Sequence, residues 1–150
     1  MNLIKIQSYN YEYTYLKYEY SKSYVIYLNL EKIKFSSVIY EHKDFTNLFL
    51  EDDYKVTVLS EDFEKLSDIL LKELNFIKLF NDKKYHSGTF EQRVFINLDK
   101  ISYIRKIGKN NSEDNYYDLY FTDSKADKCN YQIDEEDFNK IIKLSNLKKL

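Results

Sequence analysis

The chain has 150 residues and a formal net charge of −2, which fits one domain or two very small ones. At 43% hydrophobic and 17% aromatic it can bury a core, so wholesale disorder is excluded. Two glycines, no proline and one cysteine exclude glycine-rich phosphate loops, a disulfide framework and a cysteine zinc cluster.

The first half of the chain reads as strands followed by one helix. Tyrosines alternate with polar residues over 9–15, which predicts a strand with one aromatic face. The alternation changes phase near 16–17, which predicts a turn or bulge there. Further strands are expected at 25–30, 35–40, 45–50 and 54–59.

A turn and a helix close this half. Glu51-Asp52-Asp53 is expected to form the tight turn before the last strand. Ser60 is the expected N-cap of a helix over about 60–73, with acidic residues in its first turn. The apolar stripe of this helix consists of Phe63, Leu66, Leu70 and Leu74.

The second half repeats this order, with Asp134 as N-cap of a helix over about 135–147. Phe138, Ile141, Ile142 and Ser145 are expected on the inner side of that helix. The polar segment 108–115 is the expected long loop. The strands of this half are expected near 76–80, 89–96, 101–107, 116–122 and 129–133.

Four sequence matches in the same order indicate an internal repeat. The clearest is Leu28-Asn29-Leu30-Glu31-Lys32-Ile33, which recurs at an offset of 68 as Ile96-Asn97-Leu98-Asp99-Lys100-Ile101. The other matches start at residues 2 and 75, 48 and 119, and 61 and 136. We therefore expect an α+β protein built from two divergent copies, 1–74 and 75–150. Each copy is a mostly antiparallel β-sheet module ending in one helix, and the two copies are expected to pack rigidly together.

The tyrosine strip is the main candidate binding feature. Exposed tyrosines on one strand face can form a protein interface or stack single-stranded bases, and the same tyrosines can instead cover the core. The expected partner-binding residues are Tyr11, Tyr13, Tyr15, Tyr18 and Tyr20, together with Lys109, Asn110 and Asn111 in the polar loop.

Nucleic-acid binding is the alternative, with Arg105, Lys106 and Lys109 as candidate phosphate contacts. Residues 1–75 carry a net charge of −4 and residues 76–150 a net charge of +2. A sequence pI near 5.8 is far from the basic character of typical nucleic-acid binders, so a protein partner is favoured.

Catalytic and metal-binding groups are few. His42 and His86 each lie beside an expected turn and are interpreted as surface-loop residues, while Cys129 is interpreted as a half-buried strand residue. The acidic clusters are explained as turns and helix caps. We expect no enzyme activity, metal or cofactor; a metal-dependent hydrolase is the enzymatic alternative.

Residues with A/T-rich codons (Lys, Asn, Ile, Tyr and Phe) make up about half of the chain, which indicates an A/T-rich genome. The chain lacks a run of about 18 apolar residues and a signal-peptide pattern, so a cytoplasmic location without membrane contact is expected. These features favour a non-enzymatic protein-interaction module carried by a phage or plasmid. Such a module would act as an inhibitor or adaptor on a host protein surface, an anti-CRISPR-type role being one example. A homodimer is also expected, because duplicated sheets leave edge strands that need covering.

Overall fold

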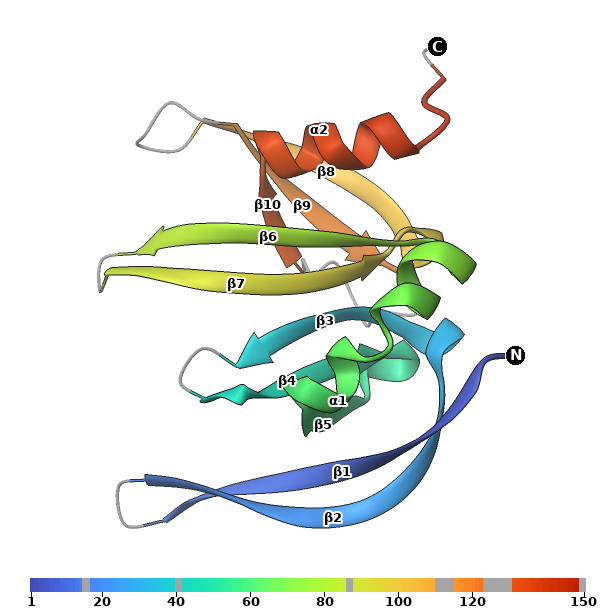
Figure 1. Ribbon diagram of the computed structural model, residues 1–150. Coiled ribbons are helices and arrows are strands. Elements are labelled where there is room, and N and C mark those ends of the chain that lie inside the picture. The colour runs from blue at the N-terminus through green and yellow to red at the C-terminus, as the bar shows by residue number, and fades with distance from the viewer. Residues whose placement is uncertain (15–16, 40–41, 86–87, 110–114, 123–130, 149–150) are drawn as a thin grey trace. The chain divides into compact units, whose positions relative to one another are not determined.

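A computed structural model describes residues 1–150 except 15–16, 40–41, 86–87, 110–114, 123–130 and 149–150, and the side chains at 12–14, 18, 80–85, 88–92 and 109. The protein is mostly antiparallel β-sheet with a C-terminal α-helix, as expected for an α+β chain (Figure 1). It divides into two compact units, Met1–Asn97 and Leu98–Leu150.

The first unit contains a seven-stranded antiparallel sheet in the order β2-β1-β5-β4-β3-β7-β6. Two long hairpins, β1–β2 and β6–β7, form its ends, and β2 and β6 are therefore its edge strands. The pairing of β1 with β5 covers only Ser8 with Val58 and Tyr9 with Thr57, so these two strands separate beyond it. The strands are β1 (Leu3–Thr14), β2 (Lys17–Asn29), β3 (Ile33–Ile39), β4 (His42–Leu50), β5 (Lys55–Leu59), β6 (Phe76–Tyr85) and β7 (Gly88–Asn97).

The expected strands of this unit other than the one at 25–30 are confirmed, and the expected phase change near 16–17 coincides with the gap between β1 and β2. The segment predicted as a separate strand at 25–30 is instead the second half of β2. It is continuous because residues 17–22 and 25–29 both pair with β1, and the register shift next to Ser8 does not end the strand.

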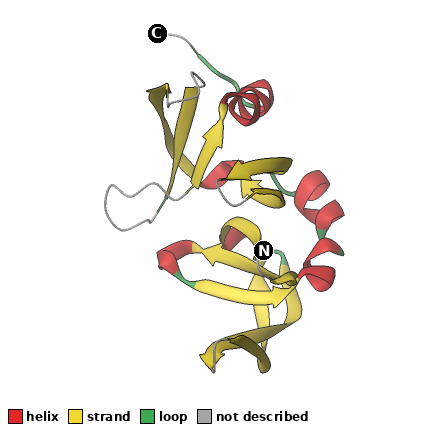
Figure 2. Ribbon diagram, turned by 90° about the vertical axis from the view of Figure 1, so that its left-hand side faces the viewer, coloured by secondary structure: helices red, strands yellow, loops and turns green. Residues whose placement is uncertain are grey.

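The core of the first unit lies between the sheet and two helical segments, α1 (Ser60–Glu64) and η3 (Ile69–Glu73), which run along one side of the strands (Figure 2). Phe63 and Leu70 from these segments are buried, and Leu66 and Leu74 pack against the same core. The expected apolar stripe is therefore confirmed. The buried cluster consists of Ile6, Leu28, Leu30, Ile33, Leu48, Val58, Phe63, Leu70, Phe76 and Phe95.

The prediction of one helix over about 60–73 is wrong, because the helical segment is interrupted after Glu64. The α-helix ends at Glu64, whose carbonyl accepts a hydrogen bond from the Ser67 hydroxyl at 2.7 Å, and a π-helical segment follows. Side-chain bonds of this kind compete with the backbone pattern of a helix. Ser60 is not the N-cap either: its hydroxyl donates to the Lys43 carbonyl at 2.8 Å and lies 2.7 Å from the Thr46 hydroxyl. The serine therefore fastens α1 to β4.

The second unit is a three-stranded antiparallel sheet in the order β10-β9-β8, followed by α2 (Glu135–Leu144). The strands are β8 (Ile101–Lys109), β9 (Asn115–Phe121) and β10 (Tyr131–Asp134). The expected N-cap is confirmed, because the Asp134 carboxylate accepts from the Asp137 amide at 2.9 Å. The helix ends three residues earlier than expected, and Ser145 is its exposed C-cap rather than an inner residue.

The order of elements is the same in both halves of the chain: a long hairpin, a 3-10 turn, three strands and a helix. The 3-10 turns are η1 (Leu30–Lys32) and η4 (Leu98–Lys100), which occupy matching positions in the sequence. The expected boundary between copies, after residue 74, lies inside the first compact unit, between η3 and β6.

The turn η2 (Glu51–Asp53) confirms the tight turn expected there, since the Leu50 amide donates to the Tyr54 carbonyl across it at 2.7 Å. Asp52 and Asp53 both have left-handed backbone, with φ of 60° and 61°. Asp53 also accepts from the ammonium of buried Lys34 at 3.3 Å.

We expect Asp52→Gly to stabilise the protein, because glycine adopts positive φ without steric cost. The expected gain is about 0.5–1 kcal/mol, and a β-branched residue in Asp52→Val should cost about 1–2 kcal/mol. Thermal unfolding of the three proteins checks the order. If Asp52→Val melted at or above the temperature of Asp52→Gly, the positive φ at this turn would be wrong.

Candidate functional site

The β1–β2 hairpin folds over β4 through an aromatic cluster. The Tyr20 ring stacks on Phe45 with centroids 3.9 Å apart and an interplanar angle of 10°. Tyr9 meets the same ring edge-on at 5.3 Å, and His42 meets Tyr20 edge-on at 5.0 Å. The cluster thus holds the hairpin against its own sheet.

This cluster divides the predicted tyrosine strip. Tyr9 and Tyr20 are half-buried in it, whereas Tyr11 is 41% exposed and lies 5.6 Å from Tyr20, its cross-strand neighbour. The interpretation of His42 as a surface-loop residue is wrong, because it begins β4 and its half-buried ring contacts Tyr20.

For the other residues expected to bind a partner, the structure describes the backbone at most. The structure places Tyr13 on β1 and Tyr18 on β2, opposite each other, without describing their side chains. Lys109 ends β8, and its side chain is likewise outside the description. Tyr15, Asn110 and Asn111, and also His86 and Cys129, lie outside the described residues.

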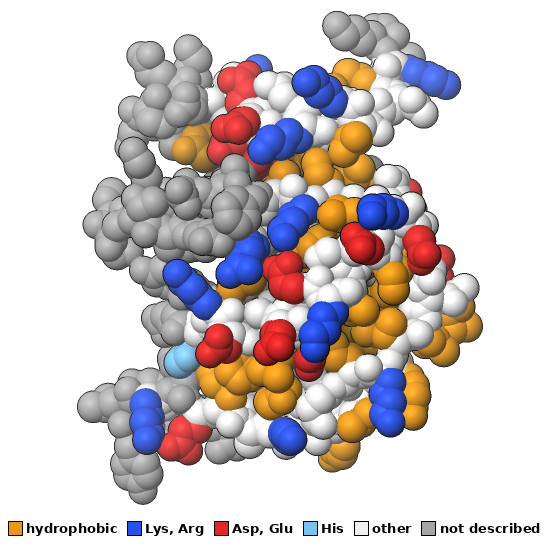
Figure 3. All heavy atoms as spheres, viewed as in Figure 1, with side chains coloured by type: hydrophobic (Ala, Val, Ile, Leu, Met, Phe, Trp, Pro, Cys, Tyr) orange, Lys and Arg blue, Asp and Glu red, His pale blue; other side chains and the backbone are white. Residues whose placement is uncertain are grey.

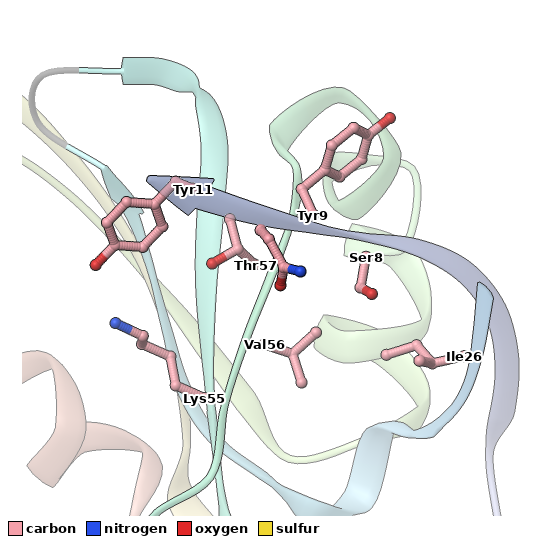
Figure 4. A pocket seen from close by; sticks show the side chains of 8 residues that line it. Ser8, Tyr9, Tyr11, Ile26, Lys55, Val56 and Thr57 are labelled. Carbon is pink, nitrogen blue, oxygen red and sulfur yellow. The ribbon is translucent and has the colours of Figure 1, made fainter. Parts of the chain in front are cut away.

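A pocket of about 370 Å³ opens where β1 and β5 separate. In Figure 4 the Tyr11 and Lys55 side chains extend toward each other on one side of it, and Ile26 and Val56 line it further along. The Lys55 ammonium lies over the Tyr11 ring, 5.6 Å from its centroid. The lining residues are Ser8, Tyr9, Asn10, Tyr11, Ile26, Lys55, Val56 and Thr57.

The lining combines one cation, neutral polar groups and apolar surface. Pockets that hold ligands are mostly apolar with a few placed polar groups and commonly measure about 300–1,000 Å³. Thr57 donates its hydroxyl proton to the Asn47 side chain at 2.7 Å, which holds this wall in place. Chemically, the pocket suits an apolar or aromatic side chain that carries or lies beside a negative group, which Lys55 would attract.

Sequence reasoning missed Lys55. It follows the acidic turn at the start of a strand, where a lysine is most often solvated. The role of Lys55 depends on the pairing of β5 with β1, the strand that carries Tyr9 and Tyr11. That pairing joins segments almost fifty residues apart, so the local sequence around Lys55 does not reveal it.

A second exposed apolar surface lies on the C-terminal half of β2, where Tyr24, Val25 and Tyr27 project from an edge strand. Figure 3 shows apolar side chains at the surface along this curved hairpin. Tyr27 is 71% exposed, although its chain neighbour Leu28 is in the core. Sequence reasoning predicted a strand here without assigning it a binding role.

Arg105, expected to contact phosphates, is paired within its own sheet. Its guanidinium donates to the buried Asp118 carboxylate at 3.2 Å and lies over the Tyr120 ring at 5.4 Å. The hydrogen bond to Asp118 is the main reason that the pKa of Arg105 lies above its usual value. Lys106 is exposed on the same strand. Sequence reasoning did not identify Asp118, which also accepts from Gln132 at 3.0 Å and so joins all three strands.

The acidic clusters at residues 51–53 and 134–137 form the turn and the helix cap that the sequence predicts. Within the described residues, His, Cys, Asp and Glu side chains do not gather in groups of three or more that could hold a metal ion. The helices in the described part of the chain are too short or too polar to cross a membrane.

Family models, curated proteins and solved structures contain no match to the chain.

Proposed function

We propose that this chain is a non-enzymatic protein-interaction module that binds another protein through Tyr11 on the β1–β2 hairpin and the pocket beside it. In this proposal it is an inhibitor or adaptor, borne by a phage or plasmid, that occupies the surface of a host protein. The observation that carries the proposal is the pocket between β1 and β5, with Tyr11 and Lys55 at one side.

The hairpin has the properties of a preorganised binding surface. Tyr20, Phe45 and Tyr9 pack together, so the backbone that presents Tyr11 is supported from beneath. Binding to a supported surface avoids part of the ordering cost that a flexible hairpin would incur. Tyrosine is also enriched among the residues that dominate interface energies.

A protein partner is better supported than a nucleic acid. Tyr20 and Lys55 lie against the Tyr11 ring, which leaves less of its faces for stacking a base. The charge of Arg105 is offset by Asp118. Nucleic-acid binding through Arg105, Lys106 and Lys109 remains the alternative proposal, and it requires binding that weakens steeply with salt.

We also propose that the two halves are divergent copies of one module. In the hairpins, Leu3 pairs with Asn29 as Phe76 pairs with Asn97, in the same register. In the following strands, Phe35 stacks on Phe49 at 4.4 Å, and Tyr103 stacks on Tyr120 at 4.3 Å. Both stacked pairs follow a register shift at the matching place.

Alanine substitutions at the pocket should reduce partner binding. We expect Tyr11→Ala and Lys55→Ala each to weaken binding at least tenfold, since a hot-spot side chain contributes about 2 kcal/mol or more. The measurement is quantitative retention of partner proteins from a lysate of the host cells by immobilised chain, followed by affinity measurement with the retained protein.

Tyr54→Ala is the matched control, because Tyr54 is 70% exposed and does not line the pocket. It should retain the partner as the unchanged chain does. Equal losses for Tyr54→Ala and Tyr11→Ala, or no stoichiometric partner for the unchanged chain, would remove the support for this proposal. Salt-dependent retention of nucleic acid instead would favour the alternative.

A further inference from the structure

We propose that strand β8 of one chain pairs antiparallel with strand β2 of a second copy of this chain. Both are edge strands in the described sheets: β2 ends the seven-stranded sheet and β8 ends the three-stranded one. The proposal concerns the 24–28 half of β2, which the proposed partner site leaves uncovered apart from Ile26. It therefore rests on the proposed repeat of the two halves, and not on the proposed partner-binding site.

The first unit already contains a pairing of this kind. Strand β3 pairs antiparallel with β7, with Phe35 opposite Ile96, Ser36 opposite Phe95 and Ser37 opposite Val94. In the repeat alignment at offset 68, β3 corresponds to β8 and β2 corresponds to β7. The β3–β7 pair is thus an internal template for a β8–β2 pair.

The correspondence extends to the structure around each strand. Over residues 25–29, strand β2 keeps the register to β1 that β7 keeps to β6, and η1 follows β2 as η4 follows β7. Strand β8 meets β9 through a register shift between Ile101 and Tyr103, as β3 meets β4 through one between Ile33 and Phe35. The two candidate strands therefore present edges shaped like those of the template.

Side chains that are buried on β3 and β7 have exposed counterparts on β8 and β2. This difference is expected when β3 and β7 are paired and the matching edges of β8 and β2 are not. Phe95 is 2% exposed on β7, whereas its counterpart Tyr27 on β2 is 71% exposed. Phe35 is 5% exposed on β3, whereas its counterpart Tyr103 on β8 is 48% exposed. Large aromatic side chains are thus retained at positions that are covered in the template and open at these two edges.

The template also sets the register. It places Tyr103 opposite Leu28 of the second copy, Ile104 opposite Tyr27, and Arg105 opposite Ile26. Continued along the strands, it brings exposed Ile107 next to exposed Tyr24. The facing segment of β2, residues 24–28, carries no charged side chain, although lysine is a common protection of free sheet edges.

A dimer with two-fold symmetry would use both edges of each chain. Each copy would give β8 to the β2 of its partner and receive the β8 of that partner on its own β2. In such a dimer every β2 and every β8 is paired, and no further copy can add. A single head-to-tail contact would instead leave one unpaired edge strand at each end of the assembly.

Disulfide trapping between differently substituted chains tests the pairing and its register. One chain carries Tyr27→Cys and the other Ile104→Cys, both with Cys129→Ser so that each has a single thiol. Directly opposed residues on antiparallel strands have Cα atoms about 4.5–5.5 Å apart, within the range that a disulfide spans. We expect the mixture to give a cross-linked heterodimer under mild oxidation, at least tenfold above a mixture of Tyr54→Cys with Ile104→Cys.

Sedimentation analysis of the otherwise unchanged chain provides the second measurement. We expect a dimer whose dissociation constant rises at least tenfold with Tyr27→Lys and stays unchanged with Tyr54→Lys, a substitution at a similarly exposed tyrosine. A monomer at all accessible concentrations, or equal cross-linking in both mixtures, would overturn the proposal. Because Tyr27 does not line the β1–β5 pocket, Tyr27→Lys should leave partner retention intact, and the two proposals can fail separately.

Discussion

Phe63→Ala should destabilise the first unit by about 3–5 kcal/mol, the range for truncating a buried phenylalanine. The ring is 2% exposed and meets Phe95 edge-on with centroids 5.6 Å apart and an interplanar angle of 87°. The loss combines removed apolar burial, the cavity that remains and the aromatic contact. Denaturant unfolding measures the free energy, and amide hydrogen exchange in β7 reports where protection is lost.

This substitution tests whether α1 and β7 share one core, although they belong to different predicted copies. Leu71→Ala is the control, since Leu71 is in the neighbouring helical segment and is 41% exposed; it should cost less than about 1 kcal/mol. If Phe63→Ala cost no more than Leu71→Ala, or if β7 kept its exchange protection, the packing of α1 on β7 would be incorrect.

Asp118→Ala should destabilise the three-stranded sheet of the second unit by about 2 kcal/mol. The buried carboxylate accepts from Arg105 on β8 and from Gln132 on β10, and hydrogen bonds to charged groups contribute about 1.5–3 kcal/mol each. The expected total is below their sum because Arg105 is largely exposed and its ion pair is screened by solvent. Exchange of β9 amides and thermal unfolding measure the effect.

Asp118→Asn separates charge from shape. The amide oxygen can still accept from Gln132, while the charge that attracts Arg105 is removed, so we expect about half the loss of Asp118→Ala. Arg105→Ala should also destabilise the sheet, because it removes the hydrogen bond that the guanidinium donates to the buried Asp118 carboxylate. An Arg105→Ala protein as stable as the unchanged chain would show that the ion pair with Asp118 contributes no net stability to the sheet.

Local patterns in the sequence were enough to predict most of the strands and the residues at which both helices begin. Alternating tyrosines predict β1 with a turn near residue 16, and Asp134 predicts the start of α2 because its carboxylate caps the helix locally. Predictions failed where a distant group decides the outcome. Ser60 looks like an N-cap, but Thr46 and the Lys43 carbonyl are within its reach once β4 lies beside α1.

The candidate site shows the same limit. The tyrosine strip was found from its alternation, and Tyr11 is indeed its exposed member among the side chains described at positions 9, 11 and 20. Lys55 joins it only because β5 pairs with β1, a contact between residues far apart in the chain. Likewise, Arg105 resembles a phosphate contact until the pairing of β8 with β9 sets it opposite Asp118.

Site-specific photocrosslinking tests the central claim, partner binding at the hairpin pocket, most directly. A photoreactive phenylalanine derivative replaces either Tyr11 or Tyr54, and each chain is irradiated in the host cells. The account predicts that position 11 captures a distinct host protein, that position 54 does not, and that Lys55→Ala removes the captured product. Equal capture from both positions, or capture at position 11 that survives Lys55→Ala, would contradict it.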